Sequence, residues 1–333
     1  MTPSDRTASL TVPASIAAEF RWSYDVANRR LAGLYERSKD GQWSAQTDID
    51  WSIDVPYGDR LPFDARFVSL NEAGGPLAAL GPDAADRFRW EFQNWMVSQF
   101  LHGEQGAMVA AGRLVEVVPG IEAKSVAATQ AVDEARHVEV FARYASVKMP
   151  HFYAISAPLE SLLGDTLRDG RWDITQLGMH IMIEALAMAA FRLGQQSFHD
   201  PLLRDICRKV ARDEARHVAF GILALEPAYL EMSAAELADR EDFVLESAAL
   251  MARRFQLVEI WEHLGIDPQA GVAYARTDPV MARYRQAVFA KVVTSLRDVG
   301  LLTPRVRDGL RGLGLLGPAT DSPGDRAADG RER

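Results

Sequence analysis

One hexapeptide, Asp-Glu-Ala-Arg-His-Val, occurs twice in the sequence, at positions 133–138 and again 80 residues later at 213–218. Each copy contains a Glu-x-x-His pair, Glu134 with His137 and Glu214 with His217. On an α-helix, residues three apart project from nearly the same face, so each pair can present a carboxylate and an imidazole to one metal ion. The repeat therefore predicts two metal-binding helices.

The repeat extends toward the N-terminus, because a further glutamate lies 30 residues before each pair, at Glu104 and at Glu184. A single Glu-x-x-His pair is usually a surface feature, and a single glutamate in an apolar stripe is often a snorkelling side chain. Four carboxylates buried together would have to be neutralised or protonated, and two divalent ions supply the four positive charges required. The doubled pattern therefore predicts a dinuclear metal site.

Long helices are needed to hold these residues, and the sequence predicts them. Proline-free apolar periodicity covers 84–118 and 121–148, and the first of these runs stops at Pro119-Gly120. Strand-like alternation is scarce, so we predict an all-α fold. The other expected helices are 21–40, 156–168, 173–198, 200–225, 233–263 and 277–300.

The predicted organisation has four parts. Glycine and proline are dense between 41 and 82, which indicates an irregular arm, 1–82, packed on the helices. The metal-binding four-helix core should span 83–226, and additional C-terminal helices should span 227–316. The polar segment 317–333 is predicted to be disordered.

Composition excludes several classes of protein. The 333 residues are 48% hydrophobic and 25% charged, which is typical of a folded chain, and Cys207 has no second cysteine to pair with. The net charge of −9 disfavours nucleic acid as a partner. No uncharged stretch reaches about 18 residues and no secretory signal opens the chain, so we expect a cytoplasmic protein without a membrane partner.

The ligand pattern resembles that of the ferritin-like dinuclear carboxylate proteins. These include ribonucleotide reductase small subunits, multicomponent monooxygenases, acyl-carrier-protein desaturases and p-aminobenzoate N-oxygenases. The resemblance covers about residues 84–225 and implies a ferritin-like four-helix bundle with extra N- and C-terminal helices. It implies that Glu104, Glu134 and His137 hold one iron. Glu184, Glu214 and His217 would hold the other, with Glu134 and Glu214 bridging.

The resemblance also gives a role to the aspartate that precedes each ligand pair. Asp133 would accept a hydrogen bond from His217, and Asp213 from His137, which would fix the orientation of each ring. The alternative is that each aspartate pairs with the arginine three residues on, Arg136 or Arg216, and both arrangements can hold together.

Three further residues are candidates for supporting roles. His180 lies one turn before Glu184 and is either a proton donor beside the ligands or, as we favour, a hydrogen-bonded core histidine. Trp43 and Trp51 in the arm could donate to the two aspartates, although packing is the favoured role. Residues beside the ligands could line an apolar pocket or simply fill the core: Phe100, Met108, Phe141, Met188, Phe191 and Phe220.

The sequence departs from each named subfamily at one position. The radical tyrosine of the reductase subunits would fall on Phe141, and Tyr144 lies one turn further along. The threonine of hydroxylases and desaturases would fall on Ala187 or Met188. The additional histidine of the N-oxygenases would fall on Val210. No single subfamily is therefore matched in full.

We expect an O2-dependent dinuclear iron oxygenase that hydroxylates or N-oxygenates a small organic substrate, free or carrier-tethered. Desaturation, a radical or oxidase protein and an iron-binding protein stay open, as do a manganese–iron pair and a homodimer. Electrons would come from a separate ferredoxin or flavin reductase, because the chain lacks a dinucleotide fingerprint and a cysteine cluster.

Overall fold

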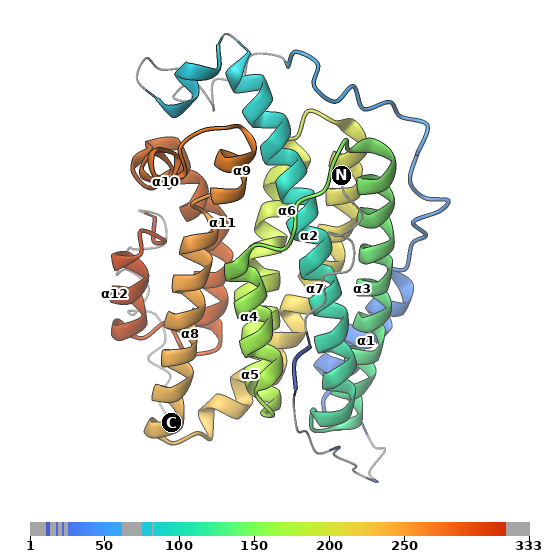
Figure 1. Ribbon diagram of the computed structural model, residues 1–333. Coiled ribbons are helices and arrows are strands. Elements are labelled where there is room, and N and C mark those ends of the chain that lie inside the picture. Colours follow the sequence, from blue (N-terminus) through green and yellow to red (C-terminus); the bar gives the residue numbers. More distant parts are fainter. Residues whose placement is uncertain are drawn as a thin grey trace.

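The computed structural model describes residues 11–13, 18, 22, 26–61, 75–81 and 83–317, and all regular structure within them is helical (Figure 1). This confirms the all-α prediction. The elements are α1 (Arg29–Asp40), η3 (Pro76–Leu80), α2 (Ala84–Val117), α3 (Ile121–Lys148), α4 (Ala157–Arg168), α5 (Trp172–Gln176), η4 (Leu177–Glu184), α6 (Ala185–Ser197), α7 (Pro201–Leu230), α8 (Ala234–Arg254), α9 (Val258–His263), α10 (Pro268–Thr277), α11 (Pro279–Asp298) and α12 (Pro304–Gly312).

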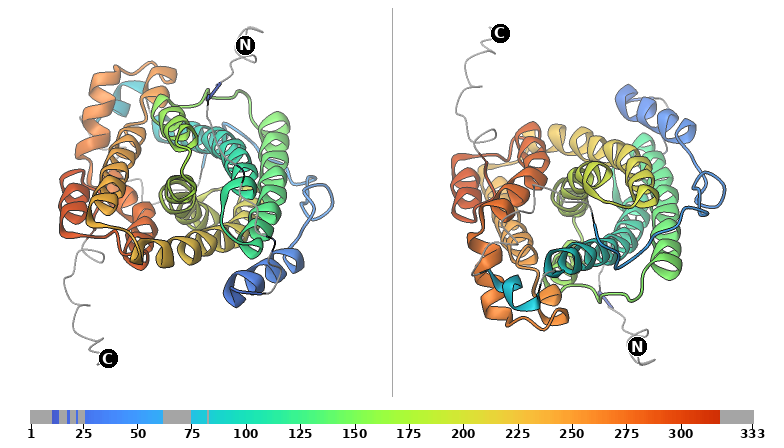
Figure 2. Two further views of the ribbon diagram at one scale, coloured as in Figure 1. Left: turned by 90° about the horizontal axis from the view of Figure 1, so that it is seen from below. Right: turned by 90° about the horizontal axis from the view of Figure 1, so that it is seen from above.

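The core is a four-helix bundle of α2, α3, α7 and the continuous run α5–η4–α6. Viewed along the bundle, the run α5–η4–α6 lies at the centre of the molecule (Figure 2). It is the one stretch of the described residues, Trp172–Ser197, that is long and apolar enough to cross a membrane, and 89% of its apolar window is buried inside the protein. Its apolar character is therefore that of a central core helix.

The ends of the bundle helices follow local sequence signals. α2 stops before Pro119, and Gly120 adopts a positive φ of 85°, which lets the chain reverse directly into α3. α7 begins at Pro201, and the Asp200 carboxylate accepts a hydrogen bond from the amide of Leu202. These signals keep α2 beside α3, and α6 beside α7, which sets the spacing of the four ligand-bearing segments.

The predicted helix 173–198 is wrong in one respect, because residues Leu177–Glu184 form a π-helix within it. A π-turn inserts additional backbone and rotates the side chains that follow, and such turns are frequent at functional sites. Here the turn ends at Glu184, one of the predicted ligands. Nothing in the local sequence marks a π-turn, so periodicity could not have located it.

The C-terminal helices differ from prediction at their boundaries. The predicted helix 233–263 is divided into α8 and α9 at Leu257, the only non-glycine residue of the described chain with a positive φ (56°). The helix expected at 277–300 corresponds to α11, while α10 and α12 were not predicted. Both have a capping residue followed by proline, Asp267-Pro268 and Thr303-Pro304, a start signal that could have revealed them.

The described part of the arm follows the outer side of α3 (Figure 1). The Lys148 ammonium donates to the carbonyl of Ile53 at 2.7 Å, and the Arg143 guanidinium lies 4.2 Å from the centre of the Trp51 ring. The arm is thereby fixed to α3. The predicted disorder of the tail falls almost wholly outside the described residues, and the domain boundaries stay predictions.

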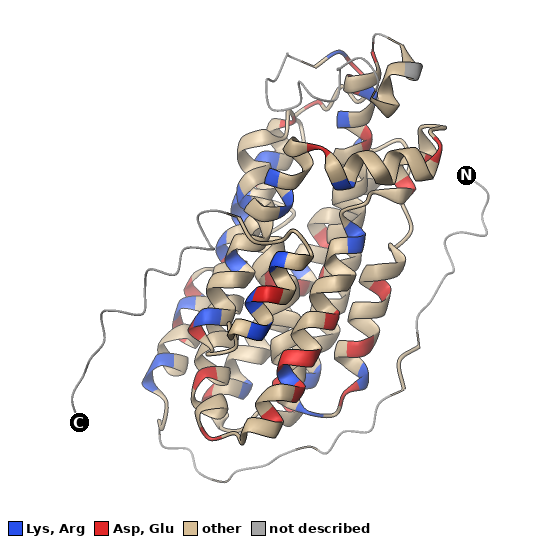
Figure 3. Cartoon of the chain, turned by 90° about the vertical axis from the view of Figure 1, so that its left-hand side faces the viewer, with Lys and Arg blue, Asp and Glu red and all other residues tan. Residues whose placement is uncertain are grey.

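The face formed by the C-terminal helices carries charges of both signs (Figure 3). Arg305 of α12 pairs there with Glu241 and Asp242 of α8. Such exposed pairs contribute at most about 1 kcal/mol each. The burial of apolar side chains is therefore what holds α12 to α8.

Candidate metal centre

The structure brings all six predicted ligands together at the centre of the bundle. One group of donor atoms within 4.8 Å of one another comes from Glu104, Glu134, His137 and Glu214. A second comes from Glu134, Glu184 and His217. None of the six residues is more than 5% exposed. Glu134 belongs to both groups, which is the position a bridging ligand requires.

Both imidazoles turn their Nδ1 atoms toward the carboxylates. The Nδ1 atom of His137 lies 3.2 Å from Glu134 Oε2 and 3.4 Å from Glu214 Oε1. The Nδ1 atom of His217 lies 3.0 Å from Glu134 Oε1 and 3.5 Å from Glu214 Oε2. Each of these two carboxylates therefore presents one oxygen to each histidine, as expected for a pair of bridges between two metal positions.

The Nε2 atoms face the opposite way and reach the aspartates across the bundle. His137 Nε2 is 3.1 Å from Asp213 Oδ2, and His217 Nε2 is 3.2 Å from Asp133 Oδ2. Both crossed contacts expected from the sequence are present. A carboxylate on Nε2 holds a hydrogen there and leaves the Nδ1 lone pair free for a metal.

The alternative pairing with arginine is present as well. Arg136 donates to Asp133 at 2.6 Å and to Asp213 at 2.9 Å, and Arg216 donates to Asp213 at 2.7 Å and to Asp133 at 3.2 Å. Although burial opposes ionisation, contacts with histidine and arginine lower the pKa of both aspartates. Two anionic acceptors are therefore fixed behind the imidazoles.

The arm completes this layer. The indole Nε1 of Trp43 donates to Asp213 at 2.7 Å, and the side-chain amide of Gln42 donates to Asp133 at 2.7 Å. The favoured packing role for Trp43 was thus incomplete. The indole of Trp51 does not reach the aspartates and donates instead to the carbonyl of Ala45 at 2.8 Å.

Gln130 was not predicted, and it links His180 to two ligands. His180 Nε2 lies 2.8 Å from Gln130 Oε1, and the amide nitrogen of Gln130 donates to Glu184 at 2.9 Å and to Glu134 at 3.1 Å. Burial, together with the nearby His217, lowers the pKa of His180 to about 3, so its ring is neutral. His180 is therefore a hydrogen-bonded core histidine that acts on the ligands through Gln130.

The charges of the centre fit two divalent ions. Burial raises the pKa of Glu104 and of Glu184 well above the usual range. Carboxylate contacts raise the pKa of His137 and His217 despite burial, so protons take the place of cations. The Oε2 atoms of Glu184 and Glu214 are buried without a hydrogen-bond partner. Four carboxylates and two imidazoles are the donor set that iron or manganese accepts.

A pocket of about 700 Å³, counted with the solvent at its mouth, reaches this centre. Glu104, Glu184 and Glu214 form part of its wall, and the remainder is largely apolar, from α2, α4, α6 and α11. Of the six predicted pocket residues only Phe100 lines it. Phe141 and Phe191 instead stack on each other at 5.7 Å within the core.

The sequence matches no protein-family model and no curated protein. Solved structures do resemble the chain. Two variants of the R2-like ligand-binding oxidase, anaerobically reconstituted with a Mn/Fe cofactor, superpose with TM-scores of 0.51 at 17% and 16% identity. They cover 83% and 85% of this chain, and 95% and 100% of their own. The chain has the R2-like ligand-binding oxidase fold. This confirms the ferritin-like bundle implied by the resemblance.

Within this R2-like oxidase fold, α7 approaches the π-helix closely at Gly221. A Cβ atom there would stand 2.5 Å from the Cβ of His180. Gly221→Ala should therefore push His180 aside and lower the free energy of unfolding by about 1–3 kcal/mol in urea denaturation. The matched control is Gly112→Ala in α2, where nothing lies within 4 Å and a gain of about 0.5–1 kcal/mol is expected. Wild-type stability of Gly221→Ala would contradict the close approach.

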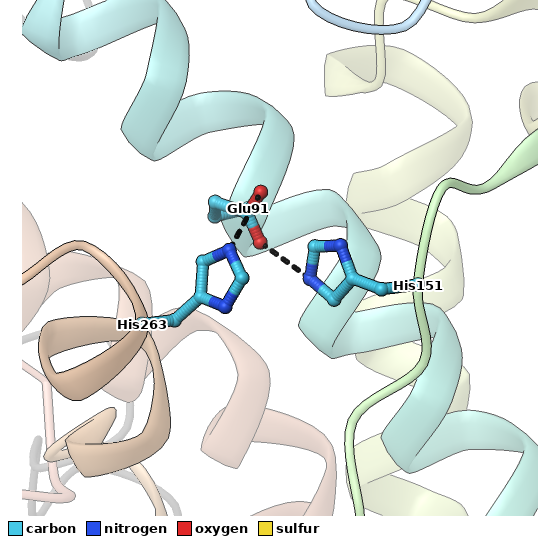
Figure 4. Close-up of side chains that lie close together, drawn as sticks. All are labelled: Glu91, His151 and His263. Carbon is cyan, nitrogen blue, oxygen red and sulfur yellow. Dashed lines mark ion pairs between the residues drawn. The ribbon is translucent and has the colours of Figure 1, made fainter. Parts of the chain in front are cut away.

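A second group of potential ligands in the R2-like fold lies further along α2 (Figure 4). The Glu91 carboxylate lies 3.0 Å from His151 Nε2 and 3.5 Å from His263 Nε2, and it accepts from the hydroxyls of Tyr153 and Tyr57. The two imidazoles are stacked at 4.4 Å with an interplanar angle of 16°, so their lone pairs do not converge on one point. The group joins α2 to α9 and to the segment after α3.

Proposed function

We propose that the chain is a dinuclear metal oxidase that uses O2 to oxidise a small organic substrate, with hydroxylation or N-oxygenation as the reaction. The observation that carries this proposal is the pocket, because three of the candidate ligands line it. An iron store does not require an apolar chamber against its ligands, whereas an enzyme that oxidises an organic molecule does. The R2-like oxidase fold supports the same conclusion.

The proposed cofactor is a pair of iron ions or a manganese–iron pair. The similar oxidases carry Mn/Fe, and the carboxylate and imidazole donors here accept either metal. When bound, such a pair supplies electrons for the reduction of O2. A separate ferredoxin or flavin reductase would restore those electrons.

The residues of the chain would position and shield this chemistry. Asp133 and Asp213 hold the imidazole rings, and Gln130 holds Glu184 and Glu134 through its amide. The apolar pocket wall keeps water from the reacting atoms and leaves room for a substrate beside the carboxylates.

The test is anaerobic loading with Fe²⁺ alone or with Mn²⁺ and Fe²⁺, followed by metal analysis and rapid mixing with O2. About two metals per chain and a substrate-dependent rise in O2 consumption, with oxygen incorporated into the product by mass spectrometry, would support the proposal. Uptake of many irons per chain without substrate dependence would favour an iron-binding protein instead.

A radical-subunit function makes a separate prediction. Phe141 occupies the position of the radical tyrosine, and the Tyr144 hydroxyl is buried between Gln93, which donates to it at 3.1 Å, and Asp200, to which it donates. We expect no long-lived phenoxyl signal in electron paramagnetic resonance after reduced, metal-loaded protein meets O2. A persistent signal that disappears in Tyr144→Phe would reverse this expectation.

A further inference from the structure

Arg254 is the only basic residue among the described residues that line the pocket. It ends α8, at the end of that helix beside α9 (Figure 1). Its guanidinium makes no hydrogen bond and no ion pair with any described residue, and its Nε atom is buried without an acceptor. A partly buried guanidinium without an anionic partner is unfavourable, since cations inside proteins are normally paired. The pocket therefore contains an unsatisfied positive charge.

The surroundings of Arg254 keep this charge in place without neutralising it. The guanidinium carbon lies 5.4 Å from the centre of the Trp95 ring, a cation–π contact that leaves the N–H groups unused. Burial lowers the pKa of Arg254 to about 10, so the group is still a cation at neutral pH. The indole nitrogen of Trp95 already donates to Glu259 at 3.2 Å.

The position of Arg254 is not explained by the end of α8. A cation in the last turn of a helix favours the helix dipole, but the exposed Arg253 already occupies that turn. The chain leaves α8 through Leu257, whose left-handed backbone is strained for a non-glycine residue, and Leu257 also lines the pocket. Strain of this kind persists where the surrounding structure fixes a functional arrangement.

We propose that Arg254 binds the anionic group of an organic acid whose apolar body fills the pocket. This inference rests on the proposed function for the identity of the ligand as substrate. Nine residues of α2 separate Trp95 from Glu104, which corresponds to about 13 Å along the helix. The anion would thus lie at the Arg254 end, remote from the carboxylates of the metal centre. The part of the substrate that is oxidised would lie beside Glu104 and Glu184.

The ligands for the test share one apolar chain and differ in their polar end: decanoate, decyl phosphate and decan-1-ol. Binding is measured by calorimetry on the full-length chain, both metal-loaded and after chelation. In the chelated protein the four carboxylates repel anions, so a preference for the acid cannot arise from coordination to metal. We expect decanoate or decyl phosphate to bind at least about tenfold more tightly than the alcohol. Which of the two binds better identifies the anionic group.

Arg254→Met should remove the preference by weakening the anions alone, and Arg254→Lys should keep part of it. Arg253→Met is the matched control, since it removes a neighbouring charge outside the pocket, and it should retain the full preference. Equal affinity for acid and alcohol in the wild type would overturn the proposal. So would an unchanged preference in Arg254→Met, an equal loss of both ligands in that variant, or no binding of any of the three.

The outcome is separable from the proposed oxidase activity. An Arg254-dependent preference in a protein that takes up no metal or does not consume O2 would keep the anion site and remove the oxidase. Substrate-dependent O2 consumption without this preference would do the reverse.

Discussion

Glu184→Ala should lower the metal content of the iron-loaded protein from about two ions per chain toward about one, because Glu184 contributes to only one of the two groups of donors. Glu134→Ala should have the larger effect, since its two oxygens face both histidines. His217→Ala should resemble Glu184→Ala. Metal content is measured by elemental analysis after anaerobic loading and removal of free iron.

The control for this series is Glu116→Ala, which removes an exposed glutamate from α2 without touching the centre, and it should retain the wild-type metal content. Unchanged metal content in both Glu184→Ala and His217→Ala would show that these residues are not ligands. The contacts in the bundle would then be a proton-neutralised polar core.

Asp213→Ala should weaken metal affinity or activity by about 10–100-fold although it removes no direct ligand. The reason is its contact with His137 Nε2 at 3.1 Å, which fixes the ring and strengthens the donor. Asp213→Asn is sharper, because it retains the size and an acceptor oxygen but removes the charge that faces two arginines. Affinity is measured by competition with a chelator.

A matched control lies on the same helix. Asp205 forms a comparable pair with Arg208 three residues on, but that pair is on the surface. Asp205→Asn should therefore leave metal affinity unchanged. Equal effects of Asp205→Asn and Asp213→Asn would assign the loss to the stability of α7 rather than to the orientation of His137.

The residues of the centre could be predicted because their signal is local and doubled. Spacings of three and 30 residues are properties of the helices themselves, so they hold whatever else packs around the bundle. Gln130 carries the same signal and could have been found, since it stands four residues before Glu134 and seven before His137 on one helical face.

The parts that could not be predicted depend on contacts between distant segments. Trp43 reaches Asp213 only because the arm is fixed to α3, and Arg254 reaches the pocket only because α8 ends beside α2. The π-helix is likewise set by packing, through the close approach of α7 at Gly221. Periodicity reports which face of a helix is apolar and does not report which helix covers it.

The crossed contacts have a two-fold symmetry. Adding 80 to Asp133 and His137 gives Asp213 and His217, and each aspartate serves the histidine of the other half. The relation is the isologous one found between identical subunits, here within a single chain. A substitution at Asp133 is therefore felt at His217, in the opposite half of the bundle. The two halves cannot diverge independently, and the positions that must change together are the ones farthest apart in the repeat.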